Sequence, residues 1–219
     1  MAPGKFITFE GGEGSGKSTQ ARLLAERLGA LEIDVLVTRE PGGSPFAERL
    51  RALLLDPAVE AHSALAEALL FYAARADHLD KIIRPALADG RWVVCDRFSD
   101  STRVYQGLAG TVPLATIEAL ERLVVHPTVP DLTFVIDIDP RVGLARAASR
   151  RVAREPRNSA PDAYEKRDPA FHARLRDGFL SIAAADPARC VVVDGGGKAE
   201  EVAKAVWATL DARLLAGAR

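Results

Sequence analysis

The sequence predicts an α/β protein whose five strands form a doubly wound parallel sheet with helices on both faces. Five short runs of apolar or β-branched residues alternate with helical patterns along the 219 residues. Several runs are apolar at consecutive positions, as in Trp92 to Cys95, which is typical of strands covered on both faces. Alternating strands and helices form parallel sheets through right-handed crossovers, and a chain of 219 residues suits one domain, 1–219.

The five predicted strands are Phe6–Glu10, Val35–Arg39, Trp92–Asp96, Leu132–Asp137 and Cys190–Asp194. In sheets of this kind, ligands bind beyond the carboxyl ends of the strands. Polar residues and glycines follow all five ends, at Gly11–Ser18, Thr38–Gly43, Asp96–Phe98, Asp137–Pro140 and Asp194–Gly197. A solvated loop explains any one of them, whereas five together favour a binding site along one edge of the sheet.

The stretch after the first strand, Gly11 to Ser18, reads GGEGSGKS and fits the G-x-x-x-x-G-K-[ST] phosphate loop. Its backbone N–H groups would surround a polyphosphate, Lys17 would reach the terminal phosphates, and the Ser18 hydroxyl would hold Mg²⁺. A flexible Gly/Ser turn is the alternative, but helical spacing from Thr19 to Leu28 places a helix N-terminus under the anion. Gly29 is predicted to cap this helix at its C-terminus.

A helix from about Ser63 to Asp89 presents two different faces. Phe71 and Arg75 lie one above the other at i and i+4, and an aromatic ring beside a guanidinium can stack on a flat base and donate to its edge. Simple surface placement is the alternative. Pro85 should kink or end the helix. The predicted buried face is Leu65, Leu69, Tyr72, Ala76, Leu79 and Ile83.

The cysteines, the histidines and two further helices receive no catalytic or binding role. Cys95 and Cys190 lie in apolar runs without metal or redox spacing, so we expect core residues. His62, His78, His126 and His172 lack ligand spacing and receive no role. Two helical stripes predict core contacts, Leu114, Ile117, Leu120 and Val124, and then Ala199, Val202, Ala203, Val206, Trp207, Leu210 and Leu214.

Charge and hydropathy exclude several classes of partner. The chain has 29 basic and 30 acidic residues and a net charge of −1, so no overall field attracts a nucleic acid polymer or an anionic membrane. Uncharged apolar stretches are too short to span a bilayer, and Glu10 and Glu13 interrupt any signal-peptide core. We therefore expect a soluble cytoplasmic protein that recognises phosphate locally.

These motifs together resemble those of the thymidylate kinases, of the nucleoside monophosphate kinase group. The matching pieces run in the family's order over nearly the whole chain, and REPGG and FYAAR are the most selective of them. They are Phe9–Thr19, Thr38–Gly43, Phe71–Arg75, Asp96–Ser101, Tyr105–Gly107, Pro130–Leu132 and Val142–Leu144. The resemblance implies a P-loop kinase fold with a helical lid at about 146–167, a homodimer, and transfer of the ATP γ-phosphoryl group to dTMP in dTTP synthesis.

The resemblance also implies roles for individual residues. Arg39 and Arg97 would bind the acceptor phosphate, Phe71 would stack on thymine, and Arg75 would donate to its carbonyl edge. Tyr105 would crowd the sugar 2′ position near Glu13, and Ser101, Thr102 and Gln106 would complete the base pocket. Phe98 stands where the family commonly has Tyr. The ATP site would comprise Gly11, Gly12, Glu13, Gly14, Ser15, Gly16, Lys17, Ser18 and Thr19.

The predicted catalytic residues are Lys17, Arg97, Arg150 and Arg154. No basic residue occupies the variable positions of the phosphate loop, and in family members of that kind the lid supplies the catalytic arginine. The candidates are Arg146, Arg150, Arg151, Arg154 and Arg157. Arg150 is the first choice, although a solvated basic helix end is an equal explanation. The turn Gly195–Lys198 would border the adenine.

Residue types alone agree with phosphoryl transfer. The transition state carries its charge on phosphate oxygens, so a site needs cations more than bases. A nucleotide phosphate with a second pKa near ~6 is already largely dianionic and requires no general base. Asp96 would orient the metal ion and Arg97 would bind phosphate, because adjacent residues at a strand end point apart; a mutually neutralising pair is the alternative.

Three other interpretations stay open. A P-loop kinase could act on another acceptor such as uridylate, a coenzyme precursor or a small alcohol, and an alcohol would demand a carboxylate base. A nucleotide-dependent switch would be expected to carry an Asn-Lys-x-Asp motif, which the sequence lacks. A purely structural role would leave the clustered arginines unexplained.

Overall fold

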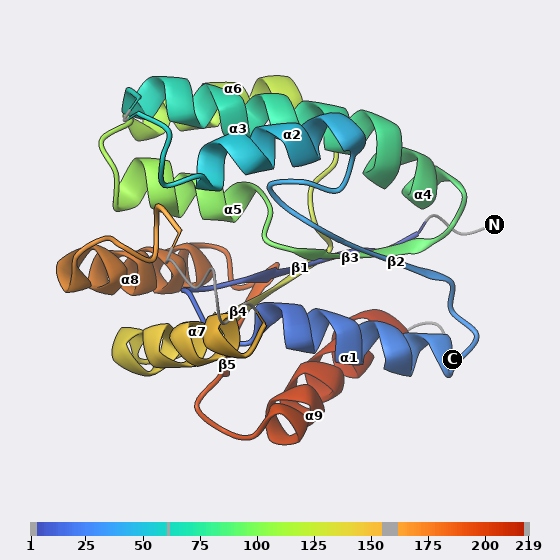
Figure 1. Cartoon of the computed structure of the whole chain (residues 1–219). Helices are drawn as coiled ribbons and strands as arrows, with labels where there is room; N and C mark the ends of the chain where they lie inside the picture. Colours follow the sequence, from blue (N-terminus) through green and yellow to red (C-terminus); the bar gives the residue numbers. More distant parts are fainter. Residues whose placement is uncertain (1–3, 61, 155–161, 217–219) are drawn as a thin grey trace.

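The computed structural model describes residues 4–60, 62–154 and 162–216, apart from the side chain of Arg154. Five strands form one wholly parallel sheet in the order β2-β3-β1-β4-β5 (Figure 1). All five predicted strands are confirmed with their bounds, and the predicted fold class is therefore confirmed. They are β1 (Phe6–Glu10), β2 (Val35–Arg39), β3 (Trp92–Asp96), β4 (Leu132–Asp137) and β5 (Cys190–Asp194).

Helices cover both faces of this sheet, as a doubly wound fold requires. In Figure 1, α2, α3 and α6 lie above the sheet and α1 and α9 below it. The elements are α1 (Lys17–Gly29), α2 (Pro45–Leu55), α3 (Ala64–His78), π-helix η1 (Leu79–Ile83), α4 (Arg84–Ala88), α5 (Ser99–Thr102), π-helix η2 (Arg103–Leu108), α6 (Leu114–Val124), α7 (Pro140–Arg154), α8 (Pro169–Ala185), α9 (Ala199–Leu210) and π-helix η3 (Asp211–Leu215).

Alternate residues of each strand feed different layers of the core. Ile7 of β1 packs with the buried side chains of α1 and α9, whereas Phe6, its neighbour, packs with those of α3, η1 and α6. Val135 of β4 packs in a third cluster, with buried residues of α8 and η2. Because both faces are covered, the strands are nearly continuously apolar. Both cysteines are buried thiols, as predicted.

The order of the strands opens a crevice beside β1. The chain runs from β1 to one edge through α1 and β2, returns through β3, and then crosses to β4 on the other side. Loops that leave β1 and β3 therefore diverge, which is the usual ligand position in such sheets. The register pairs Phe9 with Asp96, so the phosphate loop and the end of β3 lie side by side.

Two helix predictions need correction near the helix ends. The first helix begins at Lys17 instead of Thr19 and ends with Gly29 inside it, followed by Ala30 as a right-handed cap. The left-handed residue that turns the chain is Glu32, with φ of 60°. The predicted break at Pro85 lies earlier in the chain. The π-helix η1 already interrupts the α-helix at Leu79–Ile83, and Pro85 lies in the first turn of the next helix, α4.

The predicted buried face of the helix after Ser63 is right only in its second half. Tyr72, Leu79 and Ile83 are buried, but Leu65 and Leu69 are both 48% exposed. Ala68 is buried instead, because it belongs to the core cluster that includes Phe6 of β1 and Ile117 of α6. Leu114, predicted to be core, is 42% exposed. Among the described residues, no helix is both long and apolar enough to cross a bilayer.

Candidate active site

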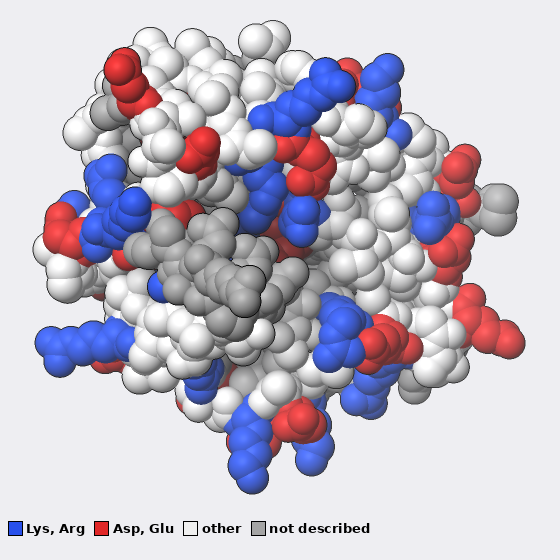
Figure 2. All heavy atoms as spheres, in the orientation of Figure 1, with Lys and Arg blue, Asp and Glu red and all other residues white. Residues whose placement is uncertain are grey.

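A cavity of about 270 Å³ lies at the carboxyl ends of the strands. Lys17, Arg39 and Arg97 all line it, although they come from three different strand ends. Figure 2 shows basic and acidic side chains gathered around a hollow in the middle of this face. The predicted residues that line the cavity are Glu13, Gly14, Gly16, Lys17, Ser18, Arg39, Phe71, Arg75, Asp96, Arg97, Ser101, Thr102, Tyr105, Gln106 and Arg150.

The phosphate loop wraps its backbone around the ammonium group of Lys17. Gly14 has φ of 66°, and a Cβ there would lie 1.8 Å from the carbonyl oxygen of Gly143, so a glycine is required. Lys17 Nζ donates to the carbonyl oxygen of Gly12 at 2.7 Å and to Ser15 Oγ at 3.3 Å. Burial, helped by the nearby Arg97 charge, lowers the pKa of Lys17 to about 8. The loop thus concentrates positive charge where it cannot be well solvated.

Arg97 occupies a strained backbone conformation at the centre of the cavity. Its φ is 70°, in the left-handed region that non-glycine residues rarely adopt. Its guanidinium donates to the carbonyl oxygen of Gly11 at 3.0 Å, to Ser101 Oγ at 3.1 Å and to Glu13 Oε1 at 2.8 Å. Burial opposes ionisation of Glu13, but the charges of Arg97 and Lys17 lower its pKa to about 2.

The backbone after β3 is fastened to the end of β1 by Glu10. One carboxylate oxygen of Glu10 accepts from the Phe98 N–H at 2.7 Å and the other from Ser101 Oγ at 2.6 Å. Burial, together with the neighbouring Asp100, raises the pKa of Glu10 to about 7. These bonds fix the turn that carries Arg97, which accounts for a strained residue keeping one orientation.

Ser18, at the end of the phosphate loop, and Asp96, at the end of β3, meet on the cavity wall. Ser18 Oγ donates a hydrogen bond to Asp96 Oδ2, and both residues line the cavity wall. A hydroxyl and a carboxylate are oxygen ligands of the kind that Mg²⁺ takes, with water and phosphate completing its octahedron. The described residues contain no cluster of three or more His, Cys, Asp or Glu side chains suited to a metal ion. One hydroxyl and one carboxylate would fill only part of that octahedron, so the pair fits Mg²⁺ if water and a ligand's phosphate oxygens supply the rest.

Sequence reasoning missed one cation of the site, Arg51 of α2. Arg51 lines the cavity and donates to the carbonyl oxygen of Pro41 at 2.7 Å. Beside it, Arg39 donates to Glu48 Oε2 at 3.1 Å, and its side chain is 55% exposed. Burial and the Arg39 charge lower the pKa of Arg51. The only sequence signal for Arg51 is its position on a helix that begins directly after the REPGG turn.

Arg75 lies buried on the wall of the cavity, and one of its three nitrogens has no hydrogen-bond partner among the described residues. Its Nε donates to Glu40 Oε2 at 2.7 Å, and Nη2 donates to the carbonyl oxygen of Phe98 at 3.0 Å and to Thr102 Oγ1 at 3.1 Å. The third nitrogen, Nη1, is buried without a hydrogen-bond partner among the described residues. A buried unpaired donor is costly, so Nη1 is suited to an acceptor on a ligand.

Tyr164, a second missed residue, closes the cavity opposite Phe71. Their ring centroids are 6.4 Å apart. Tyr164 donates to Glu67 Oε1 at 2.7 Å, and Gln106 Nε2 donates to the same oxygen at 2.7 Å. Tyr164 lies in a turn before α8, in a stretch of the sequence that carries no periodic signal. Tyr105 also lines the cavity, and its hydroxyl donates to Glu13 Oε1 at 2.7 Å.

The predicted lid arginines do not all reach the cavity. Arg150 of α7 lines it, whereas Arg146 donates to the carbonyl oxygens of Gly195 at 2.8 Å and Gly196 at 3.1 Å. Arg151 is paired with Glu165. The side chain of Arg154 and the whole of Arg157 lie outside the described residues.

Four residues predicted to bind ATP are not on the cavity wall. Gly11 and Gly12 line a much smaller cavity behind the phosphate loop, and Ser15 and Thr19 line neither. A Cβ on Gly195 would come within 3.1 Å of the carbonyl oxygen of Ser15, so the turn after β5 lies against the phosphate loop. That contact places the turn beside the phosphate loop, and its proposed role toward adenine stays a prediction.

Comparison with known proteins gives one consistent result. A family model described as thymidylate kinase matches residues 9–206. The chain is 54% identical to a thymidylate kinase of Nitrobacter winogradskyi over 97% of this chain and 90% of that one. It is 50% identical to one of Caulobacter vibrioides over 98% of this chain and 99% of that one. A crystal structure of thymidylate kinase from Ehrlichia chaffeensis is 37% identical, with a TM-score of 0.74 over 95% of this chain and 99% of that one.

Proposed function

Because the chain belongs to the thymidylate kinase family, which phosphorylates dTMP to dTDP with ATP, we propose that this cavity holds both nucleotides during the transfer. The observation that carries the proposal is Arg75 Nη1, a buried donor without a partner among the described residues. Arg75 presents donors only, so it can bind the O4 atom of thymine but not the amino group of cytosine. Phe71 on the same wall offers its ring to the base.

On the acceptor side, the nucleophile is an oxygen of the dTMP phosphate, which attacks the γ-phosphorus of ATP while the bond to ADP breaks. The dianionic phosphate needs no base, so the protein must overcome repulsion between two polyanions. Arg97 and Arg39 bind the acceptor phosphate, which guanidinium groups can do through two parallel hydrogen bonds. Arg97 is already oriented by Gly11, Ser101 and Glu13, so little reorganisation is required when the phosphate binds.

The sugar of dTMP lies between Glu13 and Tyr105 in this proposal. The Tyr105 hydroxyl and Arg97 share Glu13 Oε1, which fixes both side chains. The Tyr105 ring then occupies the space that a ribose 2′-hydroxyl would need. Ser101, Thr102 and Gln106 complete the wall around the base.

On the donor side, the phosphate loop binds the β- and γ-phosphates of ATP through its N–H groups and Lys17. Ser18 and Asp96 would hold Mg²⁺, which when bound neutralises charge on the phosphate oxygens. The turn Gly195–Lys198 borders the adenine, supported by its contacts with Arg146 and the phosphate loop.

The segment at about 146–167 acts as the lid, and Arg150 supplies the lid cation in this proposal. The support is its position on the cavity wall. Arg154, one helical turn farther along α7, is the second candidate. Closure excludes water from the transferring phosphoryl group and so suppresses hydrolysis of ATP.

The chain pairs as a homodimer through α2, α3 and α6 in this proposal, and it acts in the cytoplasm. Exposed apolar side chains on those helices support the pairing, because contiguous apolar surface is characteristic of protein interfaces. Two buried free thiols suit a reducing compartment. The exposed side chains are Phe46, Leu53, Leu65, Leu69, Leu114 and Leu123.

A panel of acceptors with ATP and Mg²⁺ tests the proposal, with release of ADP as the readout. We expect dTMP to be preferred over dCMP, and Arg75→Ala and Phe71→Ala each to raise the KM for dTMP strongly without changing the KM for ATP. The same panel examines the alternatives, because an alcohol kinase would ignore dTMP and a switch would turn over slowly. Unchanged dTMP kinetics in both variants would remove the base pocket.

A further inference from the structure

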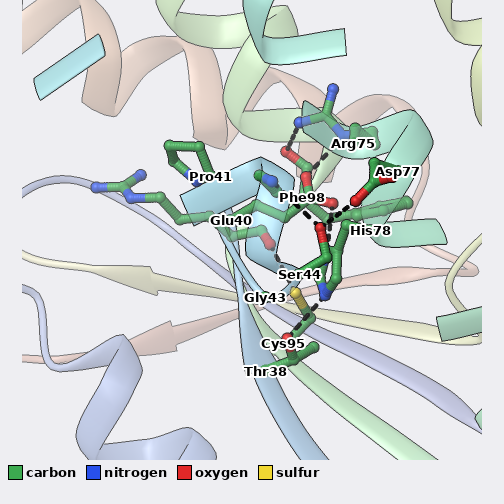
Figure 3. Close-up of polar contacts among 12 residues, drawn as sticks. Thr38, Glu40, Pro41, Gly43, Ser44, Arg75, Asp77, His78, Cys95 and Phe98 are labelled. Carbon is green, nitrogen blue, oxygen red and sulfur yellow. Dashed lines mark hydrogen bonds and ion pairs between the residues drawn. The ribbon is translucent and has the colours of Figure 1, made fainter. Parts of the chain in front are cut away.

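We propose that His78 is a positioning residue. Through Glu40 it would fix the orientation of the Arg75 guanidinium, the group proposed to bind the base. The inference rests on the proposed role of Arg75 and extends it to a residue that does not line the cavity. His78 is completely buried at the C-terminal end of α3, one turn beyond Arg75. Glu40 is 4% exposed and lies at the end of β2. In Figure 3 these three side chains lie close together, next to Gly43 and Ser44 of the turn that follows β2.

Each carboxylate oxygen of Glu40 has its own partner on α3. Oε2 accepts from Arg75 Nε at 2.7 Å, and Oε1 accepts from His78 Nδ1 at 3.0 Å. A carboxylate that accepts on both oxygens cannot rotate about its last bond without losing one of them. His78 therefore fixes the plane of the carboxylate, and the carboxylate fixes the direction of the Arg75 side chain.

The imidazole of His78 is fixed in turn from its other side. Its Nε2 lies 2.7 Å from Thr38 Oγ1, the partner in its second hydrogen bond. Gly43 packs over this bond: it has φ of 88°, and a Cβ there would lie 2.2 Å from His78 Nε2. Ser44 Oγ donates to Asp77 Oδ2 at 2.5 Å, which fastens the same turn to α3 (Figure 3).

This arrangement decides where the free donor of Arg75 lies. The guanidinium is planar, so fixing Nε and Nη2 also fixes the direction of Nη1. Nη1 must meet an acceptor on the base in a dry site, where a small displacement leaves both groups unpaired. Loss of the His78 bond should therefore weaken recognition of the base more than it affects binding of ATP.

Two substitutions of His78 separate the two hydrogen bonds that it makes. His78→Asn can place an amide N–H where Nδ1 lies and so keeps the bond to Glu40. His78→Gln reaches toward Thr38 and loses the bond to Glu40. Thr38→Val is the matched control, because it removes only the partner of Nε2. Each purified variant is assayed for KM and kcat with dTMP, dCMP and ATP, and its unfolding midpoint is measured.

We expect His78→Gln to raise the KM for dTMP about tenfold and to reduce the preference for dTMP over dCMP, as loss of a buried hydrogen bond to a charged group implies. The KM for ATP should stay unchanged. His78→Asn and Thr38→Val should stay within about twofold of the unmodified enzyme for dTMP. A purely structural role would move the unfolding midpoint in all three variants without this selective change.

The His78 variants can overturn the proposal in two ways. One is an equal effect of His78→Gln and His78→Asn on the KM for dTMP; the other is no effect of His78→Gln while Arg75→Ala raises that KM. Should His78→Gln fail to fold, Glu40→Gln takes its place, with the same selective rise expected and an unchanged dTMP KM contradicting the proposal. If Arg75→Ala itself leaves dTMP kinetics unchanged, the base-reading role fails first and the positioning role falls with it.

Discussion

Replacing Lys17 with methionine should change how stability depends on pH, because the ligand-free protein holds a buried ammonium group. Lys17 is only 6% exposed, and its two hydrogen-bond acceptors, Gly12 and Ser15, carry no charge. Methionine has a similar length, removes the charge and does not titrate. The comparison therefore isolates the contribution of the ammonium group.

The expected magnitude follows from the pKa of Lys17, which falls from 10.5 to about 8 on folding, chiefly by burial. At about 1.4 kcal/mol per pKa unit, the shift corresponds to roughly 3 kcal/mol. Between the two pKa values the unfolded chain binds the proton and the folded chain does not, so this group makes stability rise with pH in that window. Below about pH 8 the folded protein carries the full penalty, which a bound polyphosphate offsets.

Urea denaturation, followed by the fluorescence of Trp92 and Trp207, measures the free energy of unfolding at several pH values. From about pH 7 to about pH 10, the unmodified protein should gain up to roughly 3 kcal/mol relative to Lys17→Met. A difference that stays constant over this range would refute the reasoning. Lys17→Ala should also lower kcat by orders of magnitude while the protein remains folded, and near-normal turnover would contradict its role in the transition state.

Three further predictions test other parts of the site and its support. Arg150→Ala should lower kcat at least about a hundredfold, because it removes a cation beside the transferring phosphoryl group. The control is Arg141→Ala, at the exposed start of α7, which should leave kcat unchanged. Equal kcat values for the two variants would exclude Arg150 as the catalytic lid cation. Ser18→Ala should raise the Mg²⁺ concentration that gives half the maximal rate. An unchanged magnesium titration would contradict the proposal that Ser18 holds the metal ion. Arg189→Met leaves the buried Asp100 carboxylate unpaired, so urea denaturation should show a loss of about 3–5 kcal/mol, and an unaltered midpoint would contradict this.

The strands could be predicted with their bounds because several independent signals coincide at each. Apolar residues at consecutive positions indicate burial on both faces, and a polar residue or glycine marks each carboxyl end. Position on a helix face was harder to predict. Leu65 and Leu69 share the spacing of Tyr72, yet they are exposed, because only tertiary packing decides which stripe of α3 faces the sheet.

The site was predictable where one short motif carries the chemistry, as with Lys17 in the phosphate loop. Arg51 and Tyr164 were missed because each reaches the cavity from an element whose path depends on packing. Nothing in the sequence marks His78 as functional, because a sequence does not show which groups a histidine will contact. Its two hydrogen bonds arise from β2 and the turn after it, some forty residues earlier, and only the folded chain brings them together.

The central claim is that one cavity accommodates both nucleotides and neutralises their charge. Isothermal titration with an analogue that joins adenosine and thymidine through a polyphosphate tests it most directly. We predict one analogue bound per chain, and complete competition by either ATP or dTMP alone. Competition by only one of the two nucleotides, or two analogues bound per chain, would contradict a shared cavity.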